Sequence, residues 1–171
     1  MTKKVAILQS NYIPWKGYFD IINSVDEFIL FDEVQYTKRD WRNRNQIKTA
    51  QGLQWLSIPV KQSDKRFQRI CDTEISESNW GKKHWNSLSI NYSKAAFFKM
   101  YSGLFADLYL NNKETNLSKI NFQFIKAIND ILGISTKITW SSDYRTLDGK
   151  NERLLSLCHA SSAQVYLSGP A

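Results

Sequence analysis

The stretch that decides the fold lies near the amino terminus and reads Val5-Ala6-Ile7-Leu8-Gln9-Ser10-Asn11-Tyr12-Ile13-Pro14-Trp15-Lys16-Gly17. Its first four residues are apolar, which is typical of a strand buried on both faces. Residues 18–24 can form two helical turns, and residues 27–31 make a second apolar run that stops at Asp32-Glu33. A strand, a loop, a helix and a second strand within about thirty residues match the size of a βαβ unit. The opening therefore predicts two parallel strands joined by a helix.

The middle of the chain has a different pattern. Two β-rich stretches within residues 46–60 flank the turn signal Ala50-Gln51-Gly52, which predicts a hairpin. The other elements that we expect are a short strand over residues 71–75, a helix capped at Ser78 or Asn79, a helix over residues 95–110, a helix from Thr115 or Asn116 to Gly133, a strand over residues 134–140, a helix after Asp148 and a strand over residues 164–167. The phenylalanine-rich stripes of residues 95–132 are expected to lie in the core. Strand–helix alternation at both ends predicts an α/β fold with a mostly parallel sheet, flanking helices and an inserted β-hairpin.

Composition limits the class of protein. The 171 residues are 42% apolar and 13% aromatic, which excludes a disordered tail. Lys and Arg outnumber Asp and Glu by 23 to 16, so the net charge of +7 favours an anionic partner: nucleic acid, an acidic membrane surface or a phosphate-bearing substrate. No stretch approaches the roughly 20 apolar residues of a membrane span, and no signal peptide is evident, so we expect a cytoplasmic protein. Cys71 and Cys158 are isolated, which argues against a zinc site, and we expect no metal.

The positive charge is concentrated in two segments. Residues 35–48 carry a net charge of +4, from Lys38, Arg39, Arg42, Arg44 and Lys48 against Asp40. Residues 61–69 carry +3, from Lys61, Lys65, Arg66 and Arg69 against Asp64. The two segments together account for the whole net charge. If residues 46–60 form a hairpin, its ends bring both segments to one region of the molecule.

These cations can be interpreted in two ways. Charge runs are often solvated loops without a ligand. However, Tyr36, Trp41 and Trp55 are interleaved with the cations, and exposed aromatic rings beside arginine suit a flat ligand or base stacking. If the Arg42-Asn43-Arg44-Asn45 stretch is extended, both guanidinium groups face one way and the amides the other. That arrangement would make a bidentate clamp for phosphate.

The loop after the first strand is the second candidate site. In an open α/β sheet a ligand binds outside the carboxyl ends of the strands, where Gln9, Asn11 and Tyr12 are expected. The following helix would offer its amino terminus to an anion, although the loop is neither GxGxxG nor a P-loop. Asp32 follows the second strand and could bind a ribose hydroxyl, act as a base or simply end the strand. For His84 and His159 we expect structural or surface roles.

Several blocks of the sequence together resemble the WbqC-like family. They are residues 9–20, residues 32–45, Trp55-Leu56-Ser57-Ile58-Pro59-Val60 and Tyr166-Leu167-Ser168-Gly169-Pro170-Ala171. Ser10 departs from the proline more usual in the family. The resemblance implies a cytoplasmic role in bacterial surface-polysaccharide (O-antigen) biosynthesis, beside nucleotide-linked sugars. It also implies that residues 1–171 are a single domain lacking the family's usual C-terminal part.

The layout also resembles adenylyltransferase-type, Rossmann-like folds, in which the first loop and a late Ser-containing loop meet the nucleotide. Here the late loop would contain Ser168 and Gly169, but the HxGH motif of nucleotidyl transfer is absent. Amide formation on an amino sugar would fit the context that the family implies.

We therefore expect a transferase acting on a nucleotide-activated amino sugar, with a nucleotide or nucleotide sugar as the expected ligand and no certain cofactor. The expected substrate-binding residues are Gln9, Asn11, Tyr36, Lys38, Arg39, Trp41, Arg42, Asn43, Arg44, Ser168 and Gly169. Asp32 is the expected general base, and Tyr12 is a second catalytic candidate. Two alternatives remain: a nucleic-acid-binding module that uses the basic 35–69 region, and a non-catalytic scaffold of the pathway. No nucleic-acid-binding motif is recognisable, which makes the first alternative weaker than the transferase interpretation.

Overall fold

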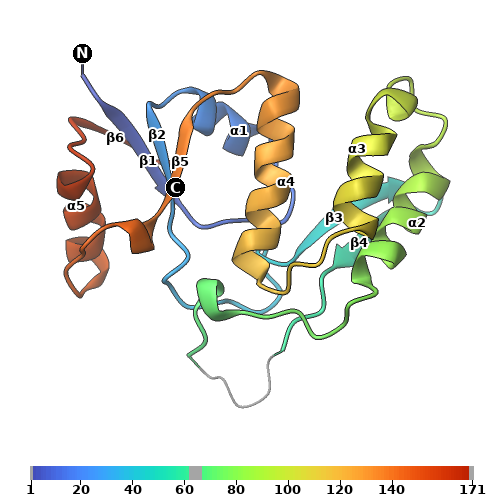
Figure 1. Cartoon of the computed structure of the whole chain (residues 1–171), viewed down its shortest axis with the longest axis horizontal. Helices are drawn as coiled ribbons and strands as arrows, with labels where there is room; N and C mark the ends of the chain where they lie inside the picture. The colour runs from blue at the N-terminus through green and yellow to red at the C-terminus, as the bar shows by residue number, and fades with distance from the viewer. Residues whose placement is uncertain (1, 62–66, 170–171) are drawn as a thin grey trace.

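A four-stranded parallel sheet forms the centre of the fold in a computed structural model, which describes residues 2–61 and 67–169 (Figure 1). Its strands are β1 (Lys4–Leu8), β2 (Glu27–Leu30), β5 (Lys137–Trp140) and β6 (Val165–Leu167), in the spatial order β5-β2-β1-β6. The predicted β1–helix–β2 unit is confirmed, with Val5 paired to Glu27 and Leu8 to Leu30. The predicted parallel α/β sheet is therefore correct.

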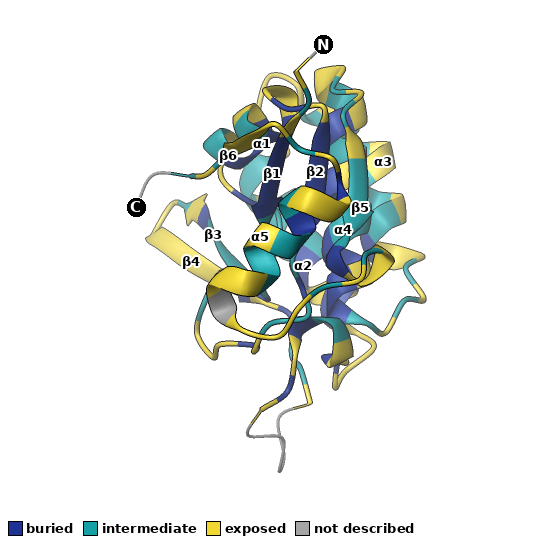
Figure 2. Cartoon of the chain, turned by 90° about the vertical axis from the view of Figure 1, so that its left-hand side faces the viewer, coloured by how far each residue is buried: buried dark blue, intermediate teal, exposed yellow. Residues whose placement is uncertain are grey.

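Helices cover both faces of this sheet because its central strands are apolar on both sides. Ala6, Phe28 and Leu30 pack against α1 (Lys16–Asn23) and α4 (Leu117–Leu132). Val5, Ile7 and Ile29 point the other way and pack against Leu157 of α5 (Lys150–Ala160). The alternation follows the two-residue period of a strand. Figure 2 shows the buried strands β1 and β2 behind α5.

A second core lies beside the sheet. It is built by the hairpin of β3 (Arg44–Thr49) and β4 (Gly52–Ser57), by α2 (Trp80–Tyr92) and α3 (Phe98–Leu110), and by the inner face of α4. The hairpin is antiparallel and turns at the predicted place, with Thr49 paired to Gly52. Ile47 and Leu56 of the hairpin pack in this core with Tyr12, so the loop after β1 joins the two cores.

The ends of α4 agree with the prediction. The Asn116 side chain accepts a hydrogen bond from the backbone N–H of Lys119, and Gly133 ends the helix in the left-handed region at φ +70°. The prediction for Asp148 is wrong, because Gly149 occupies the N-cap position of α5 and makes no side-chain hydrogen bond.

Two further expectations are corrected. Residues 71–75 form no strand: Ile70–Asp72 make a 3-10 turn, and beyond it Glu74 and Ile75 form only isolated bridges. The turn is closed by the backbone N–H of Thr73, which bonds to the Ile70 carbonyl. The stripe of α3 is core only in part: Tyr109 is the one buried residue of this helix, and Phe105 and Leu108 are partly buried against the second core.

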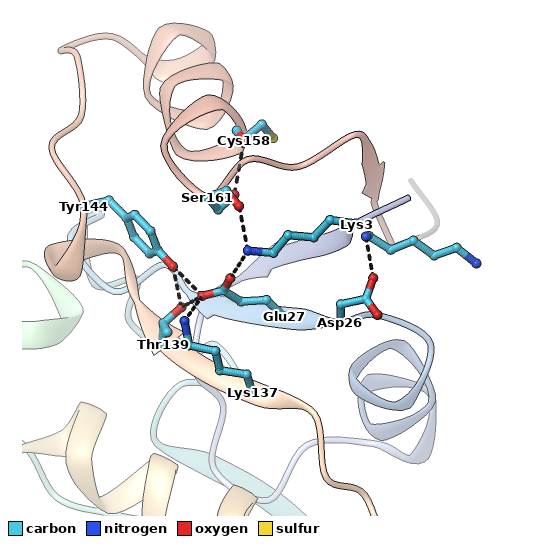
Figure 3. A network of polar contacts seen from close by, with 9 residues as sticks. Lys3, Asp26, Glu27, Lys137, Thr139, Tyr144, Cys158 and Ser161 are labelled. Carbon is cyan, nitrogen blue, oxygen red and sulfur yellow. Dashed lines mark hydrogen bonds and ion pairs between the residues drawn. The ribbon is translucent and has the colours of Figure 1, made fainter. Parts of the chain in front are cut away.

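The amino-terminal ends of the strands are joined by a buried carboxylate (Figure 3). Glu27 is 1% exposed and accepts hydrogen bonds from Lys3 (2.6 Å), Thr139 (2.9 Å) and Tyr144, with Lys137 at 3.2 Å. Burial by itself raises the pKa of this carboxyl, but the hydrogen bonds outweigh it and lower the pKa to about 2. Glu27 therefore ties β1, β2 and β5 together as an ionised group.

Candidate functional site

The loops that the sequence predicted to bind a ligand lie at the carboxyl edge of the sheet. Gln9 follows β1, Asp32 lies two residues beyond β2, and Ser168 follows β6. The chain places β2 and β5 on one side of β1 and β6 on the other. Such a switch point opens a crevice between neighbouring loops and is the usual ligand position in open α/β sheets.

Arg42 joins the loop after β1 to the turn before β3. Its Nη2 donates to the Gln9 side-chain oxygen at 2.9 Å, and its Nη1 donates to that of Asn11. Asp40 lies 3.6 Å from Nη2, and the Tyr12 N–H donates to the Trp41 carbonyl at 3.1 Å. Because two of these partners are neutral amides, only Asp40 offsets the guanidinium charge directly.

Asp32 lies beneath this loop and is 1% exposed. Its Oδ1 accepts from the backbone N–H of Ser10 at 2.8 Å, and its Oδ2 accepts from the hydroxyl of Ser118 on α4. Burial raises the pKa of this carboxyl, while the Ser118 and Ser10 hydrogen bonds and the charge of Arg42 act to lower it. In this geometry Asp32 holds the two loops together and has no contact with solvent through which it would meet a ligand.

Asn121 of α4 is a site residue that the sequence analysis missed. Its side-chain amide donates to Ser10 Oγ at 3.0 Å and to the Arg42 carbonyl at 2.9 Å. Asn121 and Ser118 are both buried polar residues on the apolar face of α4. The sequence did contain a signal for Asn121: a polar residue inside the apolar stripe of a predicted helix. Such a residue becomes buried, and buried polar groups need specific partners.

Tyr12 and His84 form a buried hydrogen-bonded chain with Tyr109. The His84 Nε2 atom lies 3.1 Å from the Ser57 carbonyl, which can only accept, so Nε2 carries the proton. Nδ1 then accepts from the Tyr12 hydroxyl at 2.9 Å, and Tyr12 accepts from Tyr109 at 2.5 Å. Burial lowers the pKa of His84 to about 4, which keeps the ring neutral. Tyr12 thus anchors the first loop from below.

The backbone of the first loop is strained at Ile13. Ile13 has φ +46°, a conformation that β-branched residues rarely adopt. The Asn45 side chain of β3 donates to the carbonyls of Tyr12, at 3.2 Å, and of Ile13. Strained residues persist where the surroundings hold them, and such positions gather at functional sites.

Two tryptophans form an exposed aromatic surface beside Arg42, here called the tryptophan platform (Trp41 and Trp55). They are 48% and 41% exposed, and their ring centroids lie 5.3 Å apart. The Arg44 guanidinium lies 4.1 Å above the Trp55 ring and also donates to the Arg39 carbonyl. The platform therefore offers flat apolar surface next to positive charge.

The expected arginine clamp has a different geometry. The clamp required an extended backbone over Arg42-Asn43-Arg44-Asn45. Arg42 instead lies in a turn, and β3 begins only at Arg44. The two arginines have different partners: Gln9 and Asn11 for Arg42, and Trp55 and the Arg39 carbonyl for Arg44.

The other expected ligand residues differ in their accessibility. Tyr36 is buried in the second core, and Asn43 is buried with its amide bonded to the Ile58 carbonyl at 2.8 Å. Lys38 and Arg39 are exposed, as is Ser168 at the end of β6, with Gly169 beside it half-buried. Only some of the predicted residues are therefore open to a ligand.

The second basic segment meets the first but is partly neutralised. Arg69 pairs with Gln35 in an isolated bridge, and its guanidinium forms an ion pair with Asp72 at 2.6 Å. Lys61 pairs with Glu74 at 2.8 Å. The remaining charged residues of this segment, Asp64, Lys65 and Arg66, lie outside the described residues.

A hollow lies next to Ser118, which bonds to Asp32. Ser118, Asn116, Cys71 and Trp140 line a hollow of about 470 Å³ beside the ends of β2 and β5. Ser118 thus faces the hollow and Asp32 together. Among residues 2–61 and 67–169, no group of three His, Cys, Asp or Glu side chains is placed to hold a metal ion.

Comparison with known proteins gives the family. The model of the WbqC-like protein family matches residues 9–171, so the chain belongs to that family. An uncharacterised protein of Mycobacterium tuberculosis is 53% identical over 169 residues, which cover 99% of this chain and 73% of the relative. No solved structure matches. Within the described part of the chain, every helix is too short or too polar to cross a bilayer.

Proposed function

We propose that this protein is a transferase of bacterial surface-polysaccharide biosynthesis, of the O-antigen type, that binds a nucleotide-activated amino sugar at the carboxyl edge of the sheet. The observation that carries the proposal is the arrangement of Arg42 between Gln9 and Asn11, beside the exposed tryptophan platform. A diphosphate needs fixed positive charge, and a base needs a flat apolar surface.

Each group has a distinct part in this proposal. Arg42 has five N–H donors and uses two on Gln9 and Asn11, so donors remain for phosphate oxygens. Trp41 stacks on the base, and the exposed Lys38 and Arg39 add charge around the phosphates. Ser168 and Gly169 follow β6, the neighbour of β1 on its other side, and would approach the ligand from there.

Asp32 and Tyr12 serve this proposal as positioning residues. Both are 1% exposed and act through the loop that they hold, Asp32 through Ser10 and Tyr12 through its own backbone. The amino sugar would be acylated to an amide: the nitrogen attacks the carbonyl carbon of an activated acyl group, the bond from that carbon to the leaving group breaks, and the nitrogen's proton passes to the leaving group. Positioning of both reactants supplies much of the rate in such a transfer.

The test is binding of nucleotide-activated amino sugars, measured by calorimetry. We expect Trp41→Ala and Arg42→Lys to weaken binding at least about tenfold, because they remove stacking and the bidentate fork, respectively. Leu53→Ala is the control, since Leu53 is exposed on β4 of the neighbouring hairpin. Unchanged affinity in both folded site variants would exclude this site.

A nucleic-acid-binding role is the second candidate, and the stacking of Arg44 on exposed Trp55 is the observation that favours it. The salt dependence of binding distinguishes the two functions. RNA binding falls steeply with salt because condensed counterions are released, whereas binding to a small-ligand site falls less. Salt-sensitive binding of RNA without binding of any nucleotide sugar would therefore favour the second function.

A further inference from the structure

The helical pair α2–α3 exposes an apolar stripe on its outer surface. Phe97 and Met100 are 65% and 68% exposed, and Leu104, one turn further along α3, is also exposed. Their spacing of three and four residues puts them on one face. Ile90, near the end of α2, is 78% exposed. Figure 1 shows α2 and α3 on the opposite side of the molecule from α5.

The surface between the two helices is hollowed and apolar as well. Trp85, Leu88 and Tyr92 of α2 face Phe98, Tyr101 and Phe105 of α3 around a hollow of about 390 Å³. Trp85 and Phe98 stack with ring centroids 5.9 Å apart, which holds the helices together beneath it. Contiguous exposed apolar surface of this kind marks an interaction site in a soluble protein.

The charged residues next to this stripe in the sequence are lysines. From residue 80 to residue 106 the charged residues are Lys82, Lys83, Lys94 and Lys99, with no acid among them. Lys83 pairs with Glu77, whereas no ion pair involves Lys94 or Lys99 among the residues that the structure describes. The first acid of α3 is Asp107, beyond Leu104. Lys94 and Lys99 bracket Phe97 in the sequence and are both exposed.

We propose that the face of α3 defined by Phe97, Met100 and Leu104, together with Lys94 and Lys99, docks on an anionic phospholipid surface. Apolar side chains that enter the headgroup region, flanked by lysines that meet lipid phosphates, are the features of interfacial binding. A second copy of the chain fits less well. A two-fold interface here would bring the lysines of both copies together with no acid from the same segment to pair with them.

Vesicle flotation tests the proposal on the whole chain. The probes are phosphatidylcholine vesicles and vesicles in which roughly one lipid in three is phosphatidylglycerol. We expect binding to the anionic vesicles alone, and weaker binding at high salt. Lys94→Gln with Lys99→Gln should reduce the partition coefficient about fivefold per lysine. Phe97→Ser with Met100→Ser should reduce it at least about tenfold by removing apolar insertion.

The control is Leu155→Ser, because Leu155 is equally exposed but lies on α5. It should bind anionic vesicles as the natural sequence does. Sedimentation of all variants reports the oligomeric state. The proposal is overturned if the chain fails to float with anionic vesicles, if Phe97→Ser with Met100→Ser floats as well as the natural sequence, or if that change instead dissociates a dimer.

Discussion

The carboxylate of Asp32 accepts a hydrogen bond of 2.8 Å from the backbone N–H of Ser10, and so joins the chain beyond β2 to the chain beyond β1. The two strands are already neighbours in the sheet, and this bond continues their pairing into the loops. Since Ser118 also bonds to Asp32, α4 is joined to the same point. The first loop is therefore held by the core before any ligand arrives.

Substitutions of Asp32 distinguish the contribution of its hydrogen bonds from that of its negative charge. Asp32→Asn keeps an oxygen for the Ser10 N–H, so we expect a loss of about 1 kcal/mol or less in the free energy of unfolding. Asp32→Ala leaves the buried N–H and the Ser118 hydroxyl without their partner and should cost about 2–3 kcal/mol. Urea denaturation measures both. Equal losses in the two variants would contradict this assignment.

His84 predicts a dependence of stability on mildly acidic pH. Its pKa falls from 6.5 to about 4 in the folded state because of burial, so the unfolded chain takes up a proton first. The contribution of neutral His84 to the free energy of unfolding should be fully present above pH 6.5. As the pH falls toward 4, the free energy of unfolding should decrease by on the order of 3 kcal/mol. Denaturation across this range checks it. His84→Gln should flatten the decline; an unchanged slope in that variant would assign the decline to another group.

Glu27 predicts a second loss of stability at lower pH. Its pKa falls from 4.5 to about 2 on folding, so the ionised form stabilises the fold above pH 4.5. That contribution should disappear as the pH falls from 4.5 through about 2. Glu27→Gln, followed by circular dichroism during acid titration, should be less stable at pH 7 and should lack this second transition. Retention of the transition would show that another carboxyl is responsible.

Two glycines provide a matched test of helix packing. A Cβ atom on Gly81 of α2 would lie 2.0 Å from the backbone oxygen of Tyr109, whereas one on Gly103 of α3 would meet nothing within 4 Å. Gly81→Ala must push the helices apart and should lower the free energy of unfolding by about 3 kcal/mol. Gly103→Ala should raise it by about 0.5–1 kcal/mol through helix propensity. Thermal melts of both variants decide whether α2 and α3 pack this closely.

The parallel sheet and the hairpin were predictable because their signals are local. Apolar runs such as residues 5–8 are long enough to identify a buried strand, and Ala50-Gln51-Gly52 marks a turn regardless of its surroundings. The exposed face of α3 was not predictable in this way. Aromatic residues at helical spacing look the same whether or not another element covers them, and only the packed structure shows that Phe97 and Met100 remain outside.

The connections within the candidate site were also beyond sequence reasoning. Tyr12 meets His84 and Tyr109 at sequence separations of 72 and 97 residues, contacts that no spacing rule anticipates. The extended geometry on which the arginine clamp depended is not found, because Arg42 lies in a turn and β3 begins at Arg44. Conversely, the placement of Gln9 and Asp32 at the carboxyl edge followed from the topology of parallel strands alone.

The strand order has a consequence for how the protein is made. β1 receives its second neighbour only when β6 pairs Val165 with Lys4, at the far end of the sequence. A ribosome would release the amino-terminal half with one side of its central strand still open, and pairing over such a separation closes slowly. The nascent chain therefore has an unpaired strand edge until residues 165–167 have been synthesised, and a chaperone would protect it most during this interval.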